Sequence, residues 1–137
     1  MTNKDILSAI TPETLSAFQD KAPEIIKESV QRSLKNKNDI VQHGDEAEKL
    51  LKIGMEYITK MLESAMSVGE ISLLKDQLSW ACDRLPHDGV EMEHLLSRFN
   101  IYRDVVDEKL PKKHSHEINR YLSWMIDYQK ELIILKG

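Results

Sequence analysis

The chain has 137 residues, of which 41% are hydrophobic and 31% charged, and its net charge is -4. This length predicts a single domain, residues 1–137, that can bury about two thirds of its unfolded surface without a disulfide. The acidic balance argues against a nucleic-acid partner, because such partners require a basic surface. No segment approaches eighteen uninterrupted apolar residues, and the start of the chain lacks a basic stretch followed by an apolar run. We therefore expect a cytoplasmic protein with no targeting peptide and no membrane span.

Apolar residues recur at helical spacing along most of the chain, and no run of six alternates as a strand would. The predicted class is therefore all-α. Within the domain, residues 1–43 should form N-terminal helices and residues 44–137 the core helices.

The N-terminal part is predicted to contain a short helix over Asp5–Ile10 and a longer one that starts at Pro12. Thr11 is a good N-cap for the longer helix, and a proline is well tolerated at the first helical position. Pro23 should break or kink this helix, so that a separate segment covers Glu24–Lys35.

The longest predicted helix covers Glu46–Met66, with Asp45 as its N-cap and Gly69 just beyond its end. Its apolar residues occupy nearly half of its circumference, which implies contacts on two sides and a central position. These residues are Leu50, Leu51, Met55, Tyr57, Ile58, Met61, Leu62 and Ala65.

Two further helices are predicted on either side of a hinge at residues 86–89, the first over 71–85 and the second from Val90 to Leu110. Each carries an apolar stripe at 3- and 4-residue spacing. A basic and prolyl linker, Leu110–Lys113, then leads to the last helix.

Polar and aromatic residues flank both stripes. Trp80 and Arg84 are four residues apart on the first helix, and Arg98 and Tyr102 have the same spacing on the second, so each pair shares one flank. Folding at the hinge would bring the pairs to a common region, which is the predicted ligand site. The competing interpretation is that the arginine methylenes cover apolar surface and that the aromatics are ordinary core residues.

The last helix should begin at His114 or Ser115 and run to the C-terminus. Beside its main stripe lies a second row with Tyr121, Trp124 and Tyr128, which is more apolar surface than one intramolecular contact needs. This row predicts a homodimer interface, and plain burial within the chain is the equal alternative.

Signals for catalysis, metal binding and haem are weak. The sequence has no glycine-rich phosphate loop, no His-Glu-x-x-His pair and no nucleophile elbow, so we do not expect an enzyme. Cys82 lies within an apolar stripe and is predicted to be an inert buried thiol. His114 and His116 alone make a poor metal site. His87 or His94 could be tried as a haem ligand, but no second histidine is placed opposite, and no haem is expected.

The segment Gly44 to Gly137 resembles the non-haem globin sensor domains at the N-termini of stressosome co-antagonist proteins and of certain sporulation sensor histidine kinases of spore-forming bacilli. The resemblance rests on the order of the helices and on an aromatic-rich terminal helix. It also rests on Asp83-Arg84 before a hinge with Gly89, and on a following helix with Leu95, Leu96, Phe99 and Tyr102.

This resemblance implies a globin-like helical bundle without haem that forms a dimer and senses a small signal. It also implies a hydrophobic tunnel for a fatty acid beside a polar chamber for a halide such as chloride. Some relatives are free-standing decoys that capture the signal of a sporulation histidine kinase and so inhibit sporulation. Because this chain ends directly after its last helix, we expect it to be such a decoy.

A medium-chain fatty acid would bury about ten methylenes at roughly 0.8 kcal/mol each, a gross gain of about 8 kcal/mol. Association costs several kcal/mol, so micromolar affinity is plausible. The acidic head would need a cationic or N–H partner, for which Arg84, Arg98, Trp80 and Tyr102 are available. The expected tunnel residues are Met55, Ile58, Leu78, Leu95, Phe99 and Met125. The alternative function is a ligand-free helical dimerisation or protein-interaction module with a fully packed interior.

Overall fold

The computed structural model describes residues 9–35, 44–84 and 92–136. The described residues form α-helices and one short 3-10 turn, without any strand, which confirms the all-α class. In chain order the elements are α1 (Pro12–Leu34), the turn η2 (Gly44–Glu46), α3 (Ala47–Val68), α4 (Ser72–Arg84), α5 (Met92–Lys109) and α6 (Lys112–Lys136). The predicted hinge at 86–89 and most of the predicted helix Asp5–Ile10 lie outside the described residues.

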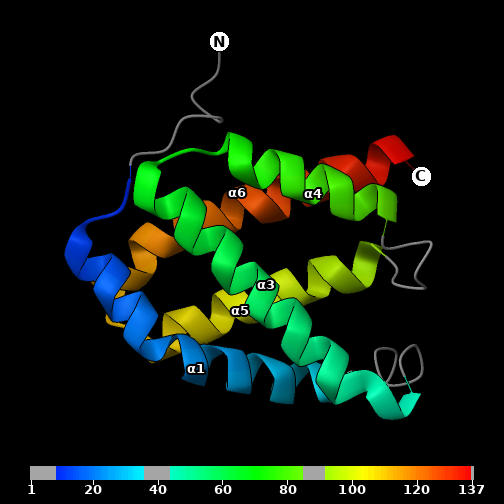
Figure 1. Ribbon diagram of the computed structural model, residues 1–137, viewed down its shortest axis with the longest axis horizontal. Coiled ribbons are helices and arrows are strands. Elements are labelled where there is room, and N and C mark those ends of the chain that lie inside the picture. The colour runs from blue at the N-terminus through cyan, green and yellow to red at the C-terminus, as the bar shows by residue number, and fades with distance from the viewer. Residues whose placement is uncertain (1–8, 36–43, 85–91, 137) are drawn as a thin grey trace.

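Helix α1 is continuous through Pro23, so the predicted break into two segments is wrong, whereas a change of direction near the middle of the helix is visible in Figure 1. Pro23 cannot donate to the carbonyl of Gln19, but both residues are exposed, so water can satisfy that carbonyl. Phe18 and Ile25 are fully buried on either side of the proline. Their burial holds both halves of α1 against the same core.

Helix α3 begins at Ala47, one residue later than predicted, and its N-cap differs from the prediction. The turn η2 already winds the backbone at Gly44–Glu46, so the N-cap is Glu46, which makes no capping hydrogen bond with its side chain, and Asp45 is not the cap. The C-terminal end agrees with the sequence. Gly69 adopts the left-handed conformation (φ 71°), and its N–H donates to the carbonyl of Ala65 at 2.8 Å.

Helix α6 begins at Lys112 rather than at the predicted His114 or Ser115. The carbonyl of Pro111 accepts from the backbone N–H groups of His114 and Ser115, both at 2.9 Å, so the helix is already formed there. The Ser115 hydroxyl instead donates to Oδ1 of Asp107 at 3.0 Å and ties the start of α6 to the end of α5.

The helices enclose one hydrophobic core. Helix α5 packs along α6, α1 packs on α3 and α5, and α4 packs on α3 and α6. In Figure 1, α3 crosses in front of α5, and the C-terminal ends of α4 and α6 lie on the same side of the molecule. Side chains from all five α-helices contribute to the core, including Phe18, Leu62, Leu74, Phe99 and Leu122. The N-terminal helix therefore shares the core of the later helices.

Candidate functional site

A polar chain crosses the apolar interior between α3 and α5. The Thr59 hydroxyl donates to the carbonyl oxygen of Met55 at 2.9 Å and lies 2.5 Å from Oη of Tyr102. Since the single proton of Thr59 is used on Met55, the Tyr102 phenol must be the donor to Thr59. Burial raises the pKa of Tyr102 well above its usual range, so the phenol stays protonated and keeps this bond.

Arg98 lies one helical turn before Tyr102 on the core side of α5. Its side chain is buried, with 8% of the residue exposed. A guanidinium is charged at every accessible pH and carries five N–H donors. A permanent positive charge is therefore carried by a side chain that is largely removed from solvent.

The expected tunnel residues do lie together in the interior. Five of the six are almost completely buried members of the same core cluster, and Leu95 packs against that cluster from a half-buried position. They come from α3, α4, α5 and α6. The five core members are Met55, Ile58, Leu78, Phe99 and Met125.

The other half of the predicted ligand region is on the surface. Trp80 is 57% exposed on α4, and Arg84 is also exposed. Helix α4 packs mainly on α3 and α6, so Trp80 and Arg84 are on its outer side. The structure therefore divides the four predicted head-group residues into an exposed pair and the buried pair Arg98 and Tyr102.

The predicted dimer row on α6 is largely used within the chain. Tyr121 is fully buried, which excludes its ring from an interface with another molecule. Trp124 and Tyr128 are half-buried and stack on each other, with ring centroids 5.0 Å apart and planes 13° from parallel. The Tyr128 hydroxyl also lies 3.0 Å from the Ser79 hydroxyl on α4. The contact between Tyr128 and Ser79 attaches α6 to α4.

Gln129 joins three helices from a fully buried position on α6. Its side-chain oxygen accepts from the thiol of Cys82 on α4 at 3.4 Å, and its amide donates to the carbonyl of Met92 on α5 at 3.5 Å. Cys82 is buried as predicted. Thr59 and Gln129 are not among the predicted site residues. The sequence feature that could have identified them is a polar side chain at a position that continues an apolar helical stripe.

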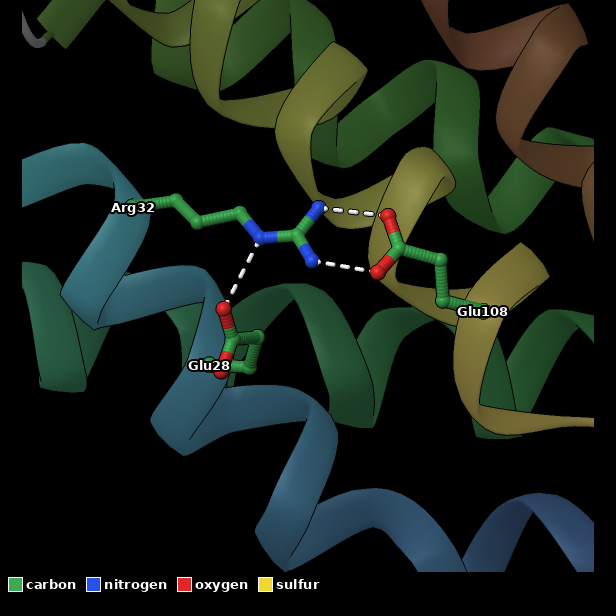
Figure 2. A network of polar contacts seen from close by, with 3 residues as sticks. All are labelled: Glu28, Arg32 and Glu108. Atoms are coloured by element: carbon green, nitrogen blue, oxygen red, sulfur yellow. Dashed lines mark hydrogen bonds and ion pairs between the residues drawn. The ribbon is translucent and has the colours of Figure 1, made fainter.

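Two polar networks fasten α1 to the C-terminal helices near the surface. Figure 2 shows the guanidinium of Arg32 on α1 bound by both oxygens of Glu108 on α5, at 2.8 and 2.5 Å, while its Nε donates to Glu28 at 2.9 Å. The hydrogen bonds from Arg32 lower the pKa of Glu108. Both partners are partly exposed, so this network contributes more to helix orientation than to stability.

The second network connects the first turns of α1 and α6. Glu117 accepts from the backbone N–H of Thr11 at 3.0 Å and from the Thr14 hydroxyl, and Nδ1 of His114 lies 2.7 Å from the Thr14 hydroxyl oxygen. These hydrogen bonds, chiefly the one from Thr14, lower the pKa of Glu117. The network fills the junction between two helix starts.

A surface groove of about 490 Å³ lies between α1 and α3. Pro23, Ile26 and Val30 line it on the α1 side, while α3 contributes a row of charged residues, Glu48, Lys52 and Glu56. Its lining includes none of the residues predicted to bind a ligand.

Among the described residues, no group of three or more His, Cys, Asp or Glu side chains could hold a metal ion. His94 is half-buried on α5, and His87 lies outside the described residues. No helix of the described part is long and apolar enough to cross a membrane.

Comparisons with protein-family models, with curated proteins and with solved structures give no match. The resemblance to non-haem globin sensor domains therefore rests on the sequence features given above.

Proposed function

We propose that this chain is a non-enzymatic sensor domain that binds a fatty acid, with the carboxylate at Arg98 and the acyl chain among the apolar core residues. The observation that carries the proposal is the burial of Arg98 on the same face of α5 as Tyr102. Desolvating a charge is costly, so a buried arginine is most useful where a negative group is bound. Its five donors can serve a carboxylate in addition to the contacts that it makes within the protein.

The acyl chain would insert among Met55, Ile58, Leu78, Phe99 and Met125, with Leu95 at the edge of the cluster. Ligand cavities have volumes of about 300 Å³ or more, so these side chains would have to rearrange around the ligand. Methionine side chains are unbranched and adaptable, and Met55 and Met125 are suited to such a rearrangement. Trp80 and Arg84, being exposed, are not needed for this form of the site.

The resemblance to sporulation sensor domains supplies the physiological part of the proposal. By sequestering the fatty acid, and with it a chloride ion in a neighbouring polar chamber, the chain would withhold the signal of a sporulation sensor histidine kinase. Sporulation would then be inhibited.

The test is a titration with dodecanoate, followed by intrinsic tryptophan fluorescence. We expect Arg98→Met to weaken dodecanoate binding by about tenfold or more, since a hydrogen bond to a charged group contributes about 1.5–3 kcal/mol. Binding of dodecanol should change little, because its head group is uncharged. Arg103→Met is the matched control: Arg103 lies on the same helix and is bound to Ser123 and Asn100 instead. Equal dodecanoate affinity in the Arg98 and Arg103 variants would contradict the assignment of Arg98.

A second candidate function is a ligand-free protein-interaction module. It is favoured by the same core cluster, in which five of the six predicted tunnel residues are buried among other apolar side chains, and by the large apolar side chains that remain exposed on α3 and α4. If dodecanoate does not bind the wild-type chain, this second function becomes the better account.

A further inference from the structure

The groove between α1 and α3 is separate from the fatty-acid site, since the two share no lining residue. Its volume of about 490 Å³ lies within the range of natural binding pockets. On the α1 side the floor is apolar: Pro23, Ile26 and Val30 are three and four positions apart and therefore share one face of the helix. Pro23 is exposed and Ile26 is half-buried, so this face is accessible to the apolar surface of a partner.

The α3 side of the groove carries charges of alternating sign. Glu48, Lys52 and Glu56 follow one another at four-residue spacing, about 6 Å apart along the helix axis, and all three are exposed. Their side chains make no ion pair or hydrogen bond with any residue of the described part of the chain. We call these three residues the α3 charge row. The row is available to charged groups of a partner.

The charges around the groove do not favour a partner of a single sign. Exposed Lys27 lines the α1 side, so the four charged lining residues sum to zero. Charges of both signs also lie next to the lining: Asp20, Lys21 and Glu24 on α1, Lys49 and Lys60 on α3. Lys21 and Glu24 are paired with each other at 3.2 Å. A uniformly basic or acidic partner therefore gains nothing here, and recognition depends on the order of its charges.

We propose that this groove binds an amphipathic α-helix of another protein. The apolar stripe of that helix lies on Ile26 and Val30. Its flank beside α3 carries a basic, an acidic and a basic residue at four-residue spacing, so that each faces an opposite charge of the α3 charge row. The apolar contact supplies the affinity. The charges set the register, because exposed ion pairs contribute little energy but disfavour wrong pairings.

A helix fits this groove better than a compact ligand does. The α3 charge row extends over two turns, about 12 Å, and a second helix laid alongside repeats the same 6 Å spacing at its own i, i+4 and i+8 positions. The apolar floor on α1 covers the same two turns, from Pro23 to Val30. An apolar stripe laid between two helices is an established mode of peptide recognition.

The test uses two synthetic helical peptides of about 18 residues, or five turns, each with a leucine stripe and a fluorescent label. The matching peptide has Lys, Glu and Lys at four-residue spacing beside the stripe; the mismatched peptide has Lys, Lys and Glu at the same positions. Their compositions and net charges are equal, so general attraction to an acidic protein cannot separate them. Fluorescence anisotropy should give a dissociation constant of about 10–100 μM for the matching peptide. The mismatched peptide should bind about fivefold more weakly or worse, because two of its three pairs become repulsive in either direction.

Variants of the chain locate the bound peptide. Ile26→Glu should weaken binding of the matching peptide about tenfold, because it places a charge on the apolar floor. Ile53→Glu is the matched control, since Ile53 is a 53% exposed apolar residue of α3 that does not line the groove, and its affinity should stay within about twofold of wild type. The combined variant Glu48→Lys, Lys52→Glu and Glu56→Lys should invert the preference between the peptides. It changes only exposed side chains, so it remains a valid test if circular dichroism shows that Ile26→Glu perturbs the fold.

Four results would overturn the proposal. They are no binding of the matching peptide at concentrations up to about 1 mM, equal affinity for the two peptides, a preference that the combined variant leaves unchanged, and binding that Ile53→Glu weakens while Ile26→Glu does not. An oligomer of the chain that Ile26→Glu dissociates in sedimentation velocity would also overturn it, because a second copy would then occupy the groove. None of these results bears on the assignment of Arg98, which lies outside the groove.

Discussion

Replacing Thr59 by valine should destabilise the protein more than replacing Tyr102 by phenylalanine, although the two residues share one hydrogen bond. Tyr102→Phe removes the donor and leaves the Thr59 hydroxyl bound to the carbonyl of Met55. The expected loss is that of a single net hydrogen bond, about 1 kcal/mol. Thr59→Val retains the shape of the side chain but leaves the Tyr102 phenol buried, with no exposed surface on the residue, opposite a methyl group. The loss should then approach the desolvation penalty of the phenol, about 2–3 kcal/mol.

The double variant distinguishes this explanation from simple packing effects. When both hydroxyls are removed no donor remains unsatisfied, so the double variant should be about as stable as Tyr102→Phe alone, and clearly more stable than Thr59→Val. Urea unfolding followed by circular dichroism would give the free energies, provided that the denaturant slopes agree. Additive losses in the double variant would refute the assignment of the Tyr102 phenol as donor to Thr59.

Two further predictions concern pH and backbone geometry. Hydrogen bonds from Thr14 and Thr11 lower the pKa of Glu117 in the folded state. The Glu117 carboxylate should therefore stabilise the protein at pH values above the unfolded-state pKa of about 4.3. This stabilisation should disappear as the pH falls through the lower pKa of the folded state. When the free energy of unfolding is measured as a function of pH, it should decrease less below about pH 4.3 in Glu117→Gln than in wild type. Equal decreases in the two proteins would contradict this prediction. Gly69→Ala should destabilise by about 1–2 kcal/mol in urea unfolding, since Gly69 has φ 71°, whereas Gly54→Ala, in an open helical position, should not. Equal losses in the two glycine variants would contradict the role of the left-handed cap.

The sequence was sufficient to predict the helices because each carries an apolar stripe at helical spacing. It did not determine where they begin, since the start of α3 depends on the 3-10 turn at Gly44–Glu46 and the start of α6 on the carbonyl of Pro111. Both are backbone features that no side-chain pattern specifies. At Pro23 the sequence contains a strong signal for a helix break, yet α1 continues through it. The burial of Phe18 and Ile25 in the core outweighs the one hydrogen bond that the proline removes.

The candidate site was predictable only in part, because the contacts between helices decide which side chains are buried. Periodicity identified Met55, Ile58, Leu78, Phe99 and Met125 as core positions and placed Arg98 and Tyr102 on one flank of a helix. It could not decide which neighbouring helix covers that flank. Trp80 and Tyr57 are aromatic residues in apolar rows, yet α4 and α3 leave them exposed, while Tyr121 in a similar row is fully buried. The partner of Tyr102, Thr59, lies 43 positions away, and the two residues meet only because α3 crosses α5 in the fold.

The central claim, that the interior binds a fatty acid at Arg98, is tested most directly by mass spectrometry of the purified protein under native conditions, with and without added dodecanoate, and of its organic extract. We predict one fatty acid per chain, either carried through purification or taken up on addition, and a marked loss of occupancy in Arg98→Met but not in Arg103→Met. An extract free of fatty acid, together with no uptake of dodecanoate by the wild-type chain, would contradict the claim.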